Sequence, residues 1–208
     1  MTILRFDRAK LTQELESLPK RLRAAFAAAC AQRFLPTHIH RAEATRTGDP
    51  SAPRRAMKAL WDSLEKDSFD ADALRSDRDV CTSLLPHPDA QFVEGEEYLD
   101  EALGSLIHAL GVQLAGDSQE AAWAAECACD ALDHHVIQQY KIDTNTNRKG
   151  AQLIIDSFPP IQAELHRQQA DLAELRHAAK NRGSEAAVIA HIRRRAEADS
   201  ATFLGPGR

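Results

Sequence analysis

Aromatic residues are scarce in this 208-residue chain, at 5% of the total, and its apolar residues are mostly Ala and Leu. Sheets are enriched in Val, Ile, Tyr and Thr, whereas helices pack well through small and unbranched side chains. The scarcity therefore favours an all-α fold over a sheet protein. It also leaves few rings for stacking on bases, so we do not expect a nucleic-acid partner.

Long apolar runs are missing too. The longest, Ala24–Ala31, is far shorter than the ~20 residues of a membrane-spanning helix. The amino-terminal residues lack the apolar core of a secretory signal. We therefore expect a cytoplasmic protein with no membrane segment. No two cysteines form a Cys-x-x-Cys pair, so in that compartment we expect four buried free thiols: Cys30, Cys81, Cys127 and Cys129.

Signature motifs of common enzymes are absent as well. The chain has no Gly-x-Ser-x-Gly, no Walker loop and no Gly-x-Gly-x-x-Gly. These absences exclude the serine elbow of α/β hydrolases and the usual phosphate-cradling loops. We expect no cofactor and a non-catalytic role through protein–protein contacts, with a homodimer as one form of such contact.

Apolar periodicity and cap residues predict a single domain over residues 1–200, followed by a loose tail at 201–208. About eight or nine helices are expected, around a long antiparallel hairpin at 94–142 that turns at Gly116 and Asp117. Pro36 is expected to end a helix. The expected helices are residues 7–18, 19–34, 37–45, 52–66, 70–85, 94–115, 117–142, 157–181 and 184–198, with 151–158 either a helical turn or a stray strand.

Several landmarks recur in one order along the chain. They are the helix Phe26–Pro36, the segment Leu60–Leu64, Leu85-Pro86 before an acidic loop to Tyr98, and the hairpin Ala102–Gln138. Over residues 20–180 this arrangement resembles the YjaG-like proteins, the domain-of-unknown-function 416 family of bacteria. The resemblance implies a compact all-α domain and supplies no reaction.

Arg33 is the charged residue that stands out in the family-like region, because it lies on an otherwise apolar helix stripe beside Phe26 and Cys30. A buried charge needs a partner. One interpretation is an internal ion pair with an acidic residue such as Asp62. The other is a contact for an anion or a carboxylate at a groove.

Charge is unevenly distributed along the chain. Residues 1–61 hold 12 Lys/Arg against 5 Asp/Glu, residues 62–143 hold 4 against 19, and residues 144–208 hold 10 against 7. Internal charge balance and solvated helix faces are one interpretation. The other is an immunity- or inhibitor-type protein that presents the acidic segment 62–143 to a basic partner such as a nuclease toxin. The binding candidates on that segment are Glu94, Glu96, Glu97 and Glu101.

Carboxylate and imidazole side chains recur at helical spacing on both arms of the hairpin. They are Glu97, Glu101 and His108 on the first arm and Glu126, Asp130 and His134 on the second. Antiparallel packing could join the two rows into a Zn, Mn or Fe site of a metal-dependent enzyme. Solvated faces of amphipathic helices produce the same spacing, and we favour that interpretation.

Overall fold

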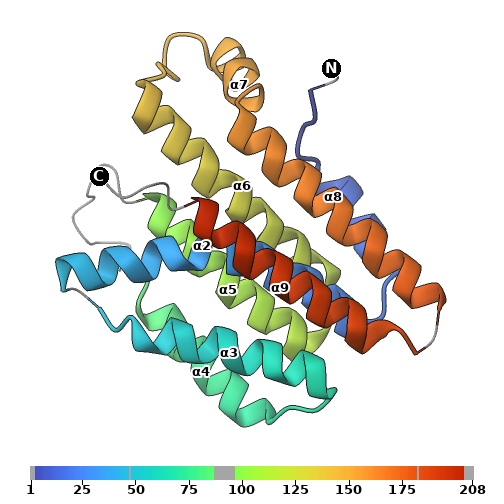
Figure 1. Cartoon of the computed structure of the whole chain (residues 1–208). Coiled ribbons are helices and arrows are strands. Elements are labelled where there is room, and N and C mark those ends of the chain that lie inside the picture. Colours follow the sequence, from blue (N-terminus) through green and yellow to red (C-terminus); the bar gives the residue numbers. More distant parts are fainter. Residues whose placement is uncertain (1–2, 47, 87–96, 182, 204–208) are drawn as a thin grey trace.

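The computed structural model describes residues 3–46, 48–86, 97–181 and 183–203, with the backbone alone at 97, 98 and 201–203. Within these ranges the chain forms nine helices and no strands, which confirms the all-α prediction (Figure 1). The helices are α1 (Arg8–Glu16), α2 (Lys20–Thr45), α3 (Ser51–Lys66), α4 (Ala71–Ser83), α5 (Glu97–Ala115), α6 (Ser118–Tyr140), α7 (Arg148–Asp156), α8 (Pro159–Lys180) and α9 (Glu185–Phe203).

The predicted break at Pro36 is wrong, because α2 continues through this residue to Thr45. Proline has no N–H, so one hydrogen bond of the helix is lost there. Phe34, Leu35 and Ile39 flank Pro36 and are all buried. Their packing against the rest of the molecule offsets the missing bond and keeps the helix continuous.

Several helices begin where the cap residues of the sequence predict. Asp7, Asp70 and Asp117 each accept a hydrogen bond from a backbone N–H in the first turn of the helix that follows. The ambiguous segment at 151–158 is helical and begins earlier than expected, at Arg148, behind the cap Asn147. The final helix is longer than expected and reaches Phe203, so part of the predicted loose tail is helical.

The predicted hairpin is formed by α5 and α6, which pack along each other and turn at Gly116 with φ +80°. Helix α2 is the most enclosed element and contacts α3, α5, α6, α8 and α9. Its run Ala24–Ala31 is completely buried, and the small side chains let these neighbours approach closely. No helix in the described part of the chain is long and apolar enough to cross a membrane.

Cations at the start of α2 bind the carbonyl ends of other helices. Lys20 donates to Leu114 O at the end of α5 (2.9 Å), and Arg21 Nε donates to Leu64 O at the end of α3 (2.7 Å). Arg23 donates to Leu18 O, beyond α1 (2.9 Å), and to the carbonyl of Gly116. Terminal carbonyls carry partial negative charge, so part of the positive charge of residues 1–61 serves to join helices.

Candidate functional site

Arg33 lies in the interior, 2% exposed, and binds two carboxylates on α8. Its Nε and Nη2 donate to Glu164 Oε1 at 3.1 and 2.8 Å, and its Nη1 donates to Asp171 Oδ2 at 2.9 Å. Both carboxylate residues are 0% exposed. Arg33 is thus the centre of a buried ion-pair network between α2 and α8.

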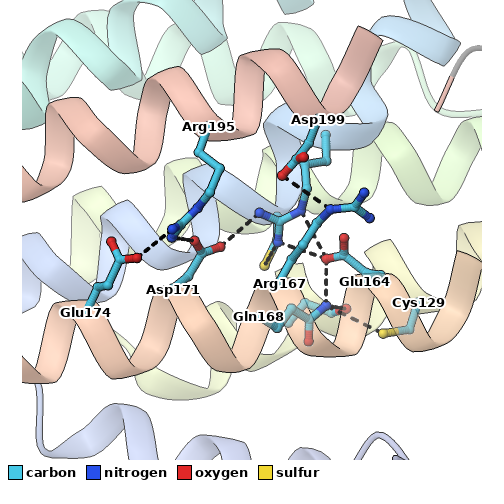
Figure 2. Close-up of polar contacts among 11 residues, drawn as sticks. Cys129, Glu164, Arg167, Gln168, Asp171, Glu174, Arg195 and Asp199 are labelled. Carbon is cyan, nitrogen blue, oxygen red and sulfur yellow. Dashed lines mark hydrogen bonds and ion pairs between the residues drawn. The ribbon is translucent and has the colours of Figure 1, made fainter. Parts of the chain in front are cut away.

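Helix α9 extends this network toward the surface (Figure 2). Arg195 lies between Asp171 and Glu174 and donates a hydrogen bond to each. A separate pair beside it joins Arg167 of α8 to Asp199 of α9 at 3.2 Å. The charges of α8 therefore hold both α2 and α9 in place.

Glu164 is the most constrained member of the buried network. Its Oε1 accepts from Gln168 Nε2 at 3.0 Å as well as from Arg33, whereas its Oε2 is buried without a hydrogen-bond partner among the described residues. Burial raises the pKa of Glu164, and Arg33 opposes the increase. Burial alone would lower the pKa of Arg33, but Glu164, Cys30 and Asp171 raise it overall. The arrangement therefore keeps Arg33 charged.

The internal ion pair expected for Arg33 is present, but Asp62, the acidic residue suggested for it, is not the partner. Asp62 pairs with Lys58 of its own helix at 2.6 Å and with Arg193 at 3.6 Å. The carboxylates that do bind Arg33 stand 131 and 138 residues along the chain, beyond the reach of any local pattern. A signal for them existed, since Glu164, Gln168 and Asp171 interrupt the apolar stripe of α8 just as Arg33 interrupts that of α2.

The four cysteines are free thiols, as expected, and three of them are buried, whereas Cys127 is only half-buried. Burial raises the pKa of each one, to about 12 for Cys81 and further for the other three. Because the thiolate is the reactive form, these side chains are poor nucleophiles near neutral pH.

The carboxylate and imidazole candidates of the hairpin point to separate neighbours. His108 Nδ1 lies 2.7 Å from Glu120 Oε2, and Glu126 pairs with Arg8 at 2.9 Å. Glu120 lies three residues after the cap residue Asp117, a spacing that suggests a capping box. Its carboxylate instead accepts a hydrogen bond from Arg78 at 3.3 Å. No three His, Cys, Asp or Glu side chains within the described ranges are placed to hold a metal ion.

Glu101 and Asp130 do lie near each other, with Cys127 hydrogen-bonded to Glu101. The side chain of Glu97 and the whole of Glu94 and Glu96 lie outside the described residues. Burial raises the pKa of Asp133, and neighbouring His134 opposes part of the increase. The hairpin thus carries a small acidic cluster, composed of Glu101, Glu126, Asp130 and Asp133.

This cluster gives a pH-dependent prediction. Burial, followed by the charges of Glu101, Glu126 and Asp133, raises the pKa of Asp130 from 3.8 to about 7. The folded protein therefore holds a proton that the unfolded chain releases near pH 4, and this group makes folding less favourable as the pH rises from about 4 to about 7. Asparagine does not titrate, so replacing Asp130 by Asn removes this pH-dependent loss of folding free energy.

We expect Asp130→Asn to raise the free energy of unfolding by about 1–2 kcal/mol at pH 8, a value reduced for solvent screening of this half-exposed side chain. The gain should vanish at pH 4. Urea titrations at both pH values measure the effect. Asp79→Asn on an exposed position of α4 is the matched control and should change stability by less than about 0.5 kcal/mol. An equal gain at both pH values would contradict the prediction.

Internal ion pairs engage much of the acidic segment 62–143. Arg193 binds Glu65 and Asp62, Arg55 binds Asp77, and Arg21 lies 3.5 Å from Asp67. Most of these basic partners come from outside the acidic segment. The observed pairs therefore agree with the internal-balance interpretation of the charge segregation.

Two short runs of arginine, Arg54–Arg55 and residues 193–195, are divided among such pairs as well. Arg54 and Arg55 bind Glu43 and Asp77, respectively. In the run at 193–195, the two outer arginines pair with carboxylates of their own and neighbouring helices. This leaves no continuous row of free cations on either cluster within the described residues.

One end of the molecule differs from the rest in what it exposes. Figure 1 shows α7 at this end, next to the last turn of α6 and the first turn of α8. Tyr140, Leu153 and Ile154 are 56%, 52% and 54% exposed, the highest values among the large apolar side chains described. Three exposed basic residues accompany them, and none forms an ion pair with the described part of the chain. We call this surface the α6–α7 end: Tyr140, Lys141, Arg148, Lys149, Leu153 and Ile154.

Comparison with known proteins shows the family to which the sequence belongs. The model of the family described as "Protein of unknown function (DUF416)" matches residues 10–205. The chain belongs to the DUF416 family. The match extends past the region of resemblance at 20–180 on both sides and includes the arginine-rich last helix.

A solved member of the DUF416 family has the same fold. The crystal structure of a DUF416 family protein from Shewanella baltica superimposes with a TM-score of 0.72 at 18% sequence identity, covering 89% of this chain and 92% of that one. No curated protein matches the chain. The family relationship thus agrees with the observed fold and assigns no chemistry to it.

Proposed function

We propose that this DUF416 protein is a non-catalytic binding protein that contacts another protein through its α6–α7 end. The observation that carries the proposal is the exposure of Tyr140, Leu153 and Ile154 on neighbouring elements at one end of the molecule. Each of these side chains exposes more than half of its surface to water. A smaller or polar residue at the same position would also be compatible with a helix. Exposed apolar groups beside polar residues are typical of protein–protein interfaces.

The arrangement of the other reactive groups supports a binding role. Burial raises the pKa of all four thiols, and Arg33 and Arg195 bind the buried carboxylates of α8. His108 is oriented by Glu120, but no hydroxyl or thiol nucleophile is hydrogen-bonded to it among the described residues. Among the described residues, His108 therefore belongs to no nucleophile–base pair.

Photo-crosslinking tests the proposal in cells that express the protein. A photoreactive amino acid at Leu153 should yield a covalent adduct with another polypeptide, visible as a shifted band and identified by mass spectrometry. The same amino acid at Ser76, exposed on α4 away from this end, is the matched control and should yield none. Equal adducts at both positions, or none at Leu153, would contradict the proposed function.

A further inference from the structure

The α6–α7 end combines two properties, and the second of them indicates the chemistry of the partner. Tyr140 contacts Phe158 with ring centroids 4.6 Å apart, so the exposed ring of Tyr140 is held against the start of α8. In α7, Ala151 and Ile155 are buried and Leu153 lies on the opposite side. The apolar surface of this end is therefore fixed in place by packing beneath it.

Unpaired positive charge accompanies that apolar surface. Lys149 lies four residues before Leu153 and shares the outward face of α7 with it. Lys141, Arg148 and Lys149 are exposed and form no ion pair with the described part of the chain, whereas most arginines elsewhere bind carboxylates.

The acidic groups of this region are engaged locally. Asp143 is the one acidic residue from Tyr140 to Ile154. Its carboxylate accepts from the backbone of Asn145 at 2.8 Å and from Thr146. At the end of α7, Asp156 binds Arg5 at 3.3 Å and accepts from Gln152, whose amide also donates to Asp133 of α6 at 3.3 Å. The net field that the α6–α7 end presents outward is thus positive.

From this complementarity we infer that the partner segment is acidic and apolar: a helix or strand with carboxylates beside aliphatic side chains. This inference rests on the proposed function, and it reverses the sign of the basic partner suggested by the charge segregation of the sequence. Apolar contact on Leu153 and Ile154 supplies affinity, while the three cations select for carboxylates and speed association.

A symmetric dimer through the same end fits the charges poorly. In a two-fold interface each patch meets its own copy, so Lys141, Arg148 and Lys149 would approach identical cations. Such like-charge contact opposes association. A separate acidic partner removes the repulsion.

Defined peptides test the partner chemistry on the full-length protein. The first probe is a fluorescent helical peptide of about 16 residues with Leu on one face and Glu on the flanking positions. The second probe replaces every Glu by Lys. Fluorescence anisotropy at about 0.05 M and about 0.5 M salt compares them, because the higher salt shortens the screening length. We expect the acidic peptide to bind at least about tenfold more tightly at low salt and to lose most of that advantage at high salt.

Variants locate the binding surface. Lys149→Glu and Leu153→Ala should each weaken binding of the acidic peptide by about tenfold or more, with unchanged circular-dichroism melting curves. Lys180→Glu, at an exposed lysine without an ion pair in the described part of the chain, is the matched control at the far end of α8 and should bind like the unmodified protein.

The outcomes separate this inference from the function on which it rests. Preference for the Lys peptide, equal binding of both peptides, or tighter binding by Lys149→Glu would overturn the inference and leave the Leu153 crosslinking result untouched. Binding to phosphatidylglycerol vesicles without binding to the acidic peptide would overturn it in favour of a lipid surface. Self-association lost in Leu153→Ala would overturn it in favour of a second copy. Failure of both the peptide assay and the crosslinking would remove the proposed function as well.

Discussion

Replacing Arg33 by methionine is expected to lower the free energy of unfolding by about 3–5 kcal/mol. Methionine fills a similar volume but leaves the buried Glu164 without a cation, while Asp171 keeps only Arg195. The loss is large because a buried carboxylate keeps the free-energy cost of lost hydration when the ion pair that compensated it is removed. Chemical denaturation followed by circular dichroism measures the change.

Two further variants separate the buried charge from other effects of this substitution. Arg194→Met, on an exposed arginine of α9, should change stability by less than about 0.5 kcal/mol. Adding Glu164→Gln to Arg33→Met should restore about 1–2 kcal/mol, because a neutral amide costs less to bury than a carboxylate. A cost below about 1 kcal/mol for Arg33→Met, or no recovery in the double variant, would show that the network does not stabilise the fold as described.

Replacing Phe26 by alanine is expected to cost about 3–5 kcal/mol. Phe26 is 0% exposed and lies on the central helix α2 among alanines, which are too small to move into the space that its ring leaves. The same denaturation experiment measures the effect.

Phe69→Ala is the matched control for Phe26→Ala. The Phe69 side chain is 41% exposed and contacts Lys20, whose ammonium nitrogen lies 5.3 Å from the ring centroid. Losing this exposed contact should cost about 1 kcal/mol or less. Similar costs for the two substitutions would mean that α2 is not the tightly packed centre of the molecule.

The internal pairing of charge changes how the sequence is interpreted for function. Taken alone, the acidic segment 62–143 suggests a negative binding face. In the fold, Arg8, Arg55 and Arg193 reach this segment from distant parts of the chain and pair with Glu126, Asp77 and Glu65. Three unpaired cations instead accompany the exposed apolar side chains of the α6–α7 end. The structure thus moves the functional proposal from the acidic segment 62–143 as a whole to the α6–α7 end.

Local patterns were sufficient to predict most helix boundaries and the need of a buried Arg33 for a partner. A cap such as Asp7 or Asp70 acts within one turn, so its effect can be read from neighbouring residues. A charge on an apolar stripe must be buried with a partner, and this too depends on one helix alone. The break expected at Pro36 failed because the deciding term was packing around α2, which no local pattern contains.

The amino-acid sequence by itself determined the all-α class, the hairpin turn at Gly116 and the need of Arg33 for a carboxylate. Only the tertiary structure decided that this carboxylate belongs to Glu164 and Asp171 rather than to Asp62. It also decided that Lys141, Arg148 and Lys149 form no ion pair with the described residues, whereas Arg55 and Arg193 bind carboxylates of the acidic segment. The physical reason is that helical periodicity defines which side chains share a face, whereas the meeting of two faces depends on how all the helices pack together.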